Sequence, residues 1–514
     1  MLRVGDICMK ILKFLSNRIV VSIILICVQI LWLALFMRYI FTDATLLKGV
    51  FIFLSVIVTL YIINNDDDDP SYKIIWLIPI LSFPVFGGLL YVVFGNKKPA
   101  KKLQEAFANQ EEAIRPFIYP NKMVEQIEDL IAKGQANYLV QENFPIYNNS
   151  EIKYYPLGDD TYPDLLKELA KAKHFIFMEY FIVEEGEMFN TVLTILKQKV
   201  KEGVEVRFMY DDMGSLTMLP FRYYQKLESY GIKCIAFNHF VPFISAVMNT
   251  RDHRKITVID GNVGFSGGFN LADEYINAKV KYGHWKDTGV MIKGEAVWNL
   301  TLMFLTTWNA SLNTFEDYDK YHPRHYICPE ISPNGYILPY GDSPLDNKPV
   351  GKNVYLNMIN QAQKYIYIDT PYLIINDEIK NALCLAVRRG VDVRIITPGI
   401  PDKKMVFKVT RSYYEPLVNG GVRIYEYTPG FIHAKNFVCD DKIATVGTIN
   451  LDYRSLYLHF ECGVYMYDVP AIKDIKKDFL KTIAVSKEMT PEDVVKGRFR
   501  GWLEAILRLF APLL

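Results

Sequence analysis

One short polar pattern occurs twice in the sequence, once near its middle and once near its end. In each copy a histidine is followed by a lysine two positions on, an aspartate seven on, a glycine fourteen on and an asparagine seventeen on. Such side chains suit phosphoryl transfer, because they can attack phosphorus, move a proton and hold phosphoryl oxygens. The copies consist of His253, Lys255, Asp260, Gly267 and Asn270, and of His433, Lys435, Asp440, Gly447 and Asn450.

The histidine and lysine of each copy stand two positions apart on a predicted strand and therefore face the same side. A cation beside a histidine is costly unless an anion joins them. A neutral imidazole can attack a phosphodiester and form a phosphohistidine, while a second, protonated imidazole donates to the leaving alkoxide. A histidine pKa of about 6.5 allows both states near neutral pH. We therefore expect the two halves to fold face to face, with His253 and His433 on one phosphate.

Each imidazole also needs an acidic partner on its other ring nitrogen. The candidates are Asp287, thirty-four residues after His253, and Glu461, twenty-eight residues after His433. Six further histidines lack such a setting and are assigned to the surface or the core. They are His174, His239, His284, His322, His325 and His459.

Other polar positions of the repeated pattern complete the candidate site. Asp260 and Asp440 are grouped with the catalytic residues, although their turn-like surroundings favour a role in holding loops. The two asparagines are candidates for binding phosphoryl oxygens. The position directly after the glycine of the pattern is glycine in the first copy and threonine in the second. These supporting residues are Asn270, Asn450, Gly268 and Thr448.

The elements around the two copies also repeat. Each half contains a strand, a helix closed by glycine and a second strand, which predicts an α/β fold with helices packed on a sheet. A repeat of this length indicates domain duplication. The expected elements are strand 175–180, helix 188–202 and strand 204–210 in the first half, and 365–369, 377–389 and 391–396 in the second.

The N-terminal region is apolar, and residues 1–98 are expected to form a membrane anchor with two to three spans at about 19–37, 44–63 and 74–94. Basic clusters stand before the first span and after the third, and the positive-inside rule places both in the cytoplasm. Either the third segment is re-entrant or one cluster lies outside. The rest of the chain is divided into a tether at 99–137, halves at 138–330 and 331–485, and an amphipathic helix at 486–514.

Two segments outside the repeats bear on lipid contact. The apolar segment 237–248 is interpreted either as buried core or as a lip that touches lipid. The C-terminal helix has an apolar face opposite Arg500, Glu504 and Arg508, so it can rest on a membrane or dock on the protein itself.

Composition narrows the classes of protein. A net charge of +1 over 514 residues argues against a broadly basic nucleic-acid binder. Seven scattered cysteines, an odd number without a C-x-x-C pair, suit reduced thiols in the cytoplasm and offer no zinc site. We expect neither a metal nor another cofactor.

The paired H-x-K-x4-D segments resemble those of the phospholipase D superfamily, and almost the whole chain resembles the bacterial cardiolipin synthases within it. The resemblance extends to the apolar N-terminus, to Thr370-Pro371-Tyr372 and to the segment His284–Thr288. It implies two tandem α/β halves with the active site at their interface, in a multi-pass protein of the bacterial cell membrane. It also implies transfer of a phosphatidyl group between two phosphatidylglycerol molecules without a metal. By analogy His253 is the nucleophile and His433 the acid and base, but the residues alone leave the reverse open.

Other functions remain in view. A membrane-anchored phospholipase D or a phosphatidylserine synthase would use water or serine as the acceptor. A phosphodiester nuclease would not need the membrane anchor. A silent membrane scaffold would be expected to lack a catalytic histidine or lysine, and both copies are intact. Oligomeric state is not indicated by the sequence.

Overall fold

A computed structural model describes the chain at residues 27–28, 31–32, 34–36, 38, 45–65, 69–95, 101–118, 122–239, 250–326, 331, 334–346, 348–495, 504 and 506–513. It divides into two compact units. One contains the N-terminal region up to Pro99 together with 238–249, and the other contains nearly all the rest. The lip predicted at 237–248 lies almost entirely outside the described residues.

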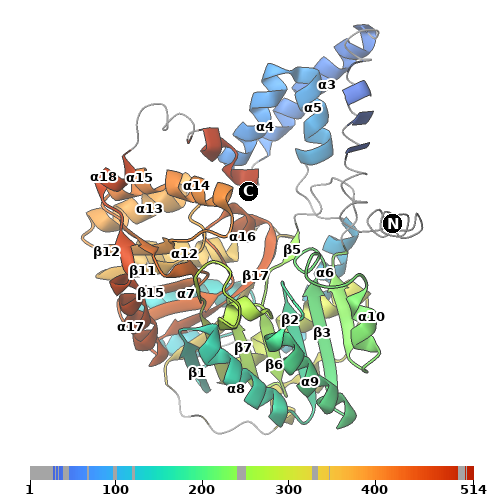
Figure 1. Cartoon of the computed structure of the whole chain (residues 1–514), viewed down its shortest axis with the longest axis vertical. Helices are drawn as coiled ribbons and strands as arrows, with labels where there is room; N and C mark the ends of the chain where they lie inside the picture. The colour runs from blue at the N-terminus through green and yellow to red at the C-terminus, as the bar shows by residue number, and fades with distance from the viewer. Residues whose placement is uncertain are drawn as a thin grey trace, which may run out of the picture. The chain divides into compact units, whose positions relative to one another are not determined.

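Among the described residues of the N-terminal unit are the helices α3 (Thr45–Asn64), α4 (Pro70–Ser82) and α5 (Pro84–Leu90) (Figure 1). The segment expected as one span at 74–94 is instead broken after Ser82, because Pro84 lacks an N–H and keeps Phe83 out of the helical region. Gly87 and Gly88 allow close packing. A Cβ at Gly87 would lie 2.3 Å from the carbonyl oxygen of Pro79, and one at Gly88 would lie 2.2 Å from Ser55 Oγ.

Membrane spans were expected at three places in this unit. Among the residues that the structure describes, none of the helices combines the length and the apolar character needed to cross a bilayer. The spans at 44–63 and 74–94 are therefore not confirmed, and the one at 19–37 lies largely outside the described residues.

The first half of the larger unit is a seven-stranded sheet in the order β1-β9-β7-β6-β2-β3-β4. Strands β2, β3 and β4 run parallel, and the others pair antiparallel. The strands are β1 (Ser150–Tyr155), β2 (Phe175–Tyr180), β3 (Glu205–Asp211), β4 (Lys233–Phe237), β6 (Ile256–Ile259), β7 (Val263–Gly267) and β9 (Gly289–Gly294). The helices are α8 (Gly158–Lys171), α9 (Glu187–Lys201), α10 (Tyr223–Glu228) and α11 (Val297–Leu312).

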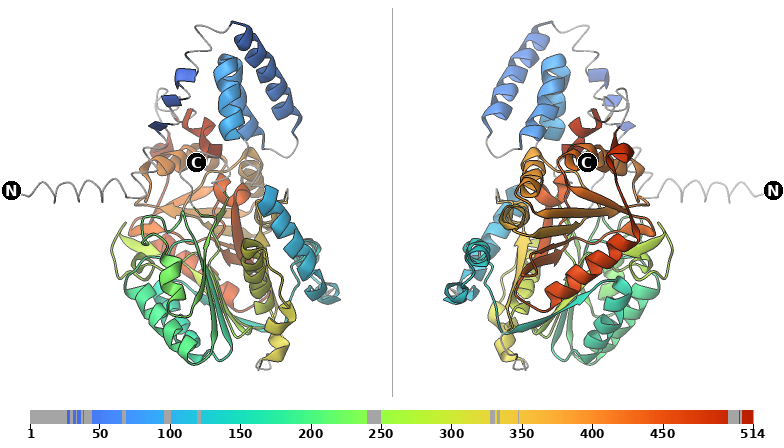
Figure 2. Two further views of the ribbon diagram at one scale, coloured as in Figure 1. Left: turned by 90° about the vertical axis from the view of Figure 1, so that its right-hand side faces the viewer. Right: turned by 90° about the vertical axis from the view of Figure 1, so that its left-hand side faces the viewer.

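The second half repeats this order as β10-β17-β16-β15-β11-β12-β13 and adds β18 at the edge. The strands are β10 (Tyr336–Asp342), β11 (Tyr365–Asp369), β12 (Asp392–Pro398), β13 (Arg423–Tyr427), β15 (Asn436–Cys439), β16 (Ile443–Gly447), β17 (His459–Tyr467) and β18 (Ser486–Glu488). The helices are α12 (Val350–Gln361), α13 (Asp377–Arg388), α14 (Lys404–Ser412), α15 (Tyr414–Asn419), α16 (Tyr453–Tyr457), α17 (Ala471–Ala484) and α18 (Pro491–Val494). The predicted duplication of an α/β fold is confirmed (Figures 1 and 2).

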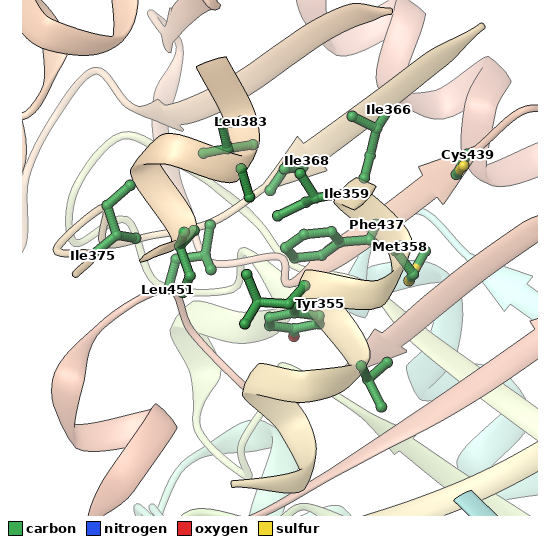
Figure 3. Packing of buried hydrophobic residues seen from close by; sticks show 14 of the residues in the cluster. Tyr355, Met358, Ile359, Ile366, Ile368, Ile375, Leu383, Phe437, Cys439 and Leu451 are labelled. Carbon is green, nitrogen blue, oxygen red and sulfur yellow. The ribbon is translucent and has the colours of Figure 1, made fainter. Parts of the chain in front are cut away.

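Apolar side chains between helices and sheets hold each half together. In the second half, the rings of Tyr355 on α12 and Phe437 on β15 stack with centroids 3.9 Å apart, among aliphatic side chains of β11 and α13 (Figure 3). A second core cluster contains residues of both halves, including Val258 and Val446. The two sheets therefore share apolar packing.

Two segments differ in structure from what the sequence led us to expect. The segment 99–137 is no free tether, because α6 (Lys101–Ile114) packs on α11 and buries Phe107, which stacks on Phe460. Helix α7 (Leu130–Gln141) buries Leu139 in the core of the second half. Residues 486–494, expected in a C-terminal helix, form β18 and α18 instead, and β18 extends the second sheet.

Candidate active site

Two very short strands carry the repeated histidines from each half to the other. Strand β5 (Arg251–Asp252) pairs with β17 of the second half, and β14 (Gly430–Ile432) pairs with β8 (His284–Lys286) of the first half. The pairing continues at the histidines. His253 N–H donates to the carbonyl of Phe460 at 2.9 Å, and His433 N–H donates to that of Lys286 at 2.7 Å. Backbone hydrogen bonds thus fix both histidines across the interface.

The crossed strands also decide which acid meets which histidine. Nδ1 of His253 lies 2.9 Å from both carboxylate oxygens of Glu461, and Nδ1 of His433 lies 2.6 Å from Oδ2 of Asp287. Both nominated carboxylates therefore bind imidazoles. Each belongs to the half opposite its histidine, whereas sequence order had grouped each with the histidine of its own half. Carboxylates on Nδ1 leave Nε2 available for chemistry.

Both imidazoles are buried, with 7% of His253 and 8% of His433 exposed. Burial, followed by the charge of Lys255, lowers the pKa of His253 well below its usual value. Burial and Lys435 lower the pKa of His433 to about 4, although Asp287 acts in the opposite direction. Without an anion, both rings are therefore neutral at pH 7. A bound phosphate would offset the lysine charges and favour the protonated form.

The two lysines of the motif are almost fully buried and lie beside the histidines. The ammonium groups of Lys255 and Lys435 donate to the backbone carbonyls of His253 and His433. Burial lowers the pKa of Lys255 to about 8 and that of Lys435 to about 7. Neither ammonium group forms an ion pair with a carboxylate among the residues that the structure describes, so both can receive an anion.

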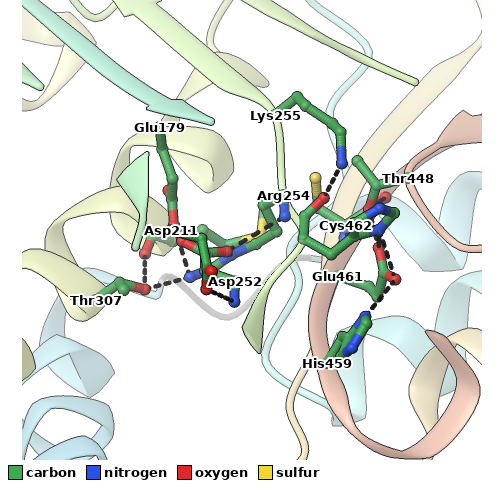
Figure 4. A network of polar contacts seen from close by, with 12 residues as sticks. Glu179, Asp211, Asp252, Arg254, Lys255, Thr307, Thr448, His459, Glu461 and Cys462 are labelled. Carbon is green, nitrogen blue, oxygen red and sulfur yellow. Dashed lines mark hydrogen bonds and ion pairs between the residues drawn. The ribbon is translucent and has the colours of Figure 1, made fainter. Parts of the chain in front are cut away.

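Thr448 and Gly268 stand at the position where the two copies differ, and each lies against an orienting carboxylate. The hydroxyl of Thr448 donates to Glu461, and the backbone N–H of Cys462 donates to Thr448 Oγ1 at 2.9 Å (Figure 4). At the matching position a Cβ on Gly268 would lie only 2.0 Å from Oδ1 of Asp287. Burial raises the pKa of Glu461 to about 8. The glutamate thus gains a hydroxyl donor, whereas the aspartate needs a glycine.

The two asparagines of the motif are buried but differ in their contacts. Asn270 accepts from Ile182 N–H at 2.9 Å and donates to the hydroxyl of Tyr275 at 2.7 Å, so its amide is committed to the protein. The ring of Tyr275 lies 5.6 Å from that of His433, so Asn270 supports the histidine indirectly. Oδ1 of Asn450 has no hydrogen-bond partner among the described residues.

The aspartates of the motif do not belong to the site. Asp260 and Asp440 follow β6 and β15, at the opposite ends of these strands from the histidine and lysine pairs. Each carboxylate accepts three backbone N–H groups, those of residues 173–175 and of residues 363–365. They hold the turns that precede β2 and β11, which is the role that their turn-like surroundings in the sequence favoured over a catalytic one.

The sequence interpretation missed two rings that flank the histidines. The ring centroid of His459 lies 5.6 Å from that of His253, and Trp285 lies 5.6 Å from His433. Each stands two residues before an orienting carboxylate, within β17 for His459 and at the end of β8 for Trp285. In an extended chain this spacing puts side chains on one face. That spacing was the available signal.

Among the described residues, His253, His459 and Glu461 form one grouping whose ligand atoms lie within 4.8 Å of one another. Their donor types suit a transition metal. Yet His459 lies in the positive field of Arg454, Lys255, Arg251 and Lys403. That charge disfavours a dication and favours an anion.

Comparisons with known proteins match these halves. The model of a family described as "Cardiolipin synthase, PLD-like domain" matches residues 165–297 and 355–483, and one described as "Phospholipase D-nuclease N-terminal" matches 53–96. The chain is 46% identical, over 88% of its length and 99% of the relative, to an uncharacterized protein of Streptococcus mutans. It is 35% identical, over 93% of its length and 97% of the relative, to a cardiolipin synthase of a Geobacillus strain.

Solved structures agree at the level of the fold. The crystal structure of a phosphatidylserine synthase from Haemophilus influenzae aligns with a TM-score of 0.55 at 15% identity. The alignment covers 74% of this chain and 98% of that one. At this identity the likeness concerns the arrangement of the two α/β halves.

Proposed function

The chain belongs to the cardiolipin synthases of the phospholipase D superfamily, and we propose that it converts two phosphatidylglycerol molecules into cardiolipin and glycerol. The observation that carries the proposal is the pair of imidazoles, each bound at Nδ1 by a carboxylate of the other half and each beside a buried lysine. This arrangement supports double displacement at phosphorus without a metal.

In the first step, Nε2 of one histidine attacks the phosphorus of the donor lipid, and the bond to the glycerol headgroup breaks. The second histidine gives its proton to the departing glycerol oxygen. Lys255 and Lys435 offset the charge on the phosphoryl oxygens. We assign attack to His253 and proton transfer to His433, by analogy with the family.

In the second step, the hydroxyl of a second phosphatidylglycerol gives its proton to His433 and attacks the phosphorus. The bond between phosphorus and His253 breaks, and cardiolipin leaves. Glu461 and Asp287 keep each ring oriented and stabilise its positive charge during both steps.

Lipid substrates call for contact with a membrane, and we assign this contact to residues 1–98. Exposed apolar side chains on α3 support it, since Leu46 is 86%, Phe53 65% and Leu60 61% exposed. The match of residues 53–96 to an N-terminal family model adds support. The described cysteines form no disulfide, in keeping with a catalytic unit in the cytoplasm of a bacterium.

Incubation of the purified full-length protein with phosphatidylglycerol vesicles, without added metal, tests the proposal. We expect glycerol and cardiolipin to appear in equal amounts, and His253→Gln and His433→Gln to abolish both products. Phosphatidic acid as the sole lipid product would identify a hydrolase instead, and phosphatidylserine formed on addition of serine would identify a synthase of that lipid.

A further inference from the structure

The two lipids of the proposed reaction each carry a phosphodiester, but the paired histidines and lysines bind only one. The donor's phosphate lies between the histidines and becomes attached to one of them. The acceptor brings a second negative charge, one glycerol away from the hydroxyl that attacks. An enzyme that transfers to such an acceptor needs further positive charge beside the catalytic pair, whereas a hydrolase does not.

His459 lies beside His253, and its two ring nitrogens form no hydrogen bond in the described part of the chain. It is 9% exposed. Its Nδ1 lies 3.9 Å from Glu461 (Figure 4). The carboxylate of Glu461 is already bound to His253. A buried imidazole without a partner is costly unless a ligand supplies one.

The carboxylate of Glu461 aside, the charged side chains that act on His459 are all cations, namely Arg454, Lys255, Arg251 and Lys403. Arg454 on α16 is half-buried and makes no ion pair with any residue that the structure describes. Lys403 lies over the ring of Tyr372 at 5.9 Å and also lacks an ion pair in the described part of the chain. Arg251, by contrast, lies 3.8 Å from Asp211. Asp452 is an acidic residue near Arg454 and Lys403. Its side chain caps α16 by accepting a hydrogen bond from Ser455 N–H.

We propose that Arg454, His459 and Lys403 form a second anion subsite, which binds the phosphodiester of the acceptor phosphatidylglycerol. The guanidinium and the imidazole N–H donate to the phosphate oxygens, and the ammonium group adds charge at the exposed side. The subsite rests on the proposed function and deepens it, because it explains preference for a lipid acceptor over water.

A comparison of two reactions from the same donor tests the subsite. Cardiolipin formation uses an acceptor with a phosphate, and exchange of labelled glycerol into phosphatidylglycerol uses an acceptor without one. Both proceed through the same phosphatidyl-enzyme. For Arg454→Gln and His459→Gln we expect cardiolipin formation to fall roughly tenfold or more relative to glycerol exchange, with Arg454→Lys falling less.

Lys403→Gln offers a test that does not depend on a buried substitution, because Lys403 is exposed. We expect the same shift in the ratio of the two reactions, to a smaller extent. Arg388→Gln, an exposed change on α13, is the matched control and should leave both rates unchanged.

Equal loss of both reactions in all three subsite variants would overturn the subsite while leaving the proposed function intact. A wild-type protein that exchanges glycerol but forms no cardiolipin would overturn the proposed function and the subsite together. A ratio that shifts in the Arg388→Gln control would also count against a specific anion site.

Discussion

The crossing of the two carboxylates can be tested by double-mutant cycles on folding stability. The relevant changes are His433→Gln and Asp287→Asn, which keep similar volumes and remove the bond between Nδ1 and Oδ2. If the crossed arrangement is correct, the effects of these two changes are not additive. Asp287→Asn combined with His253→Gln serves as the control cycle, because these residues belong to the same half but share no bond.

The size of the coupling follows from the geometry. The bond measures 2.6 Å, and its side chains are 10% and 0% exposed, so solvent screens it little. Hydrogen bonds to charged groups contribute about 1.5–3 kcal/mol. We expect this coupling for His433 with Asp287, and less than about 0.5 kcal/mol for the control cycle.

Urea unfolding of the four proteins in each cycle, in one detergent and at pH 7, supplies the measurement. His253→Gln with Glu461→Gln should also give a non-additive effect, since that contact crosses between the halves. The coupling should be smaller, because the raised pKa of Glu461 leaves its carboxyl largely neutral at pH 7. A larger coupling between His253 and Asp287 than between His433 and Asp287 would refute the crossed arrangement.

Three further outcomes are expected. Gly268→Ala should reduce the rate of transfer at least tenfold without unfolding the protein, because its Cβ would displace Asp287. Gly134→Ala is the control and should leave the rate unchanged, because the nearest atom to its Cβ lies 4.0 Å away. Equal rates for the two variants would contradict the reasoning. Without ligand, the free energy of unfolding should rise as pH increases from about 7 towards 10, because Lys435 (pKa about 7) is then neutral in the folded state and still protonated in the unfolded state. Lys435→Met should flatten that slope in urea titrations, and an unchanged slope would disprove the cause. Asp260→Asn should lower the melting temperature yet keep most of the activity per folded molecule, which thermal scans and assays can separate.

Periodicity and motif spacing predicted much of the fold. Strands β2 and β11 and helices α9 and α13 lie within a few residues of their expected ranges, because each is a continuous apolar or amphipathic run. The break at Pro84 was not predicted, although the proline itself was visible. The packing of α6 was also missed, because that helix is mostly polar and buries only Phe107 and Gln110.

The residues of the site were easier to predict than the pairing of each histidine with its carboxylate. Two copies with identical spacing identified the histidines and lysines, and the need for an acid on the other nitrogen of each imidazole led to both carboxylates. The exchange of carboxylates depends on β5 and β14, which have two and three residues and carry no periodic signal of their own. His459 was assigned with five other histidines to the surface or the core, because none of them stands in a comparable motif. Its contact with His253 and its ring nitrogens without a hydrogen bond among the described residues distinguish it in the structure.

Because β5 and β14 each pair with a strand of the opposite half, neither half contains a histidine together with its orienting carboxylate. Cutting the chain near residue 331 would leave His253 and Asp287 in one fragment and His433 and Glu461 in the other. Each histidine would then be separated from the carboxylate that binds it. Each piece alone would be inert, however well it folded. Mixing the two fragments should restore activity only to the extent that they associate, so the rate of the reaction would measure the fraction of associated fragments.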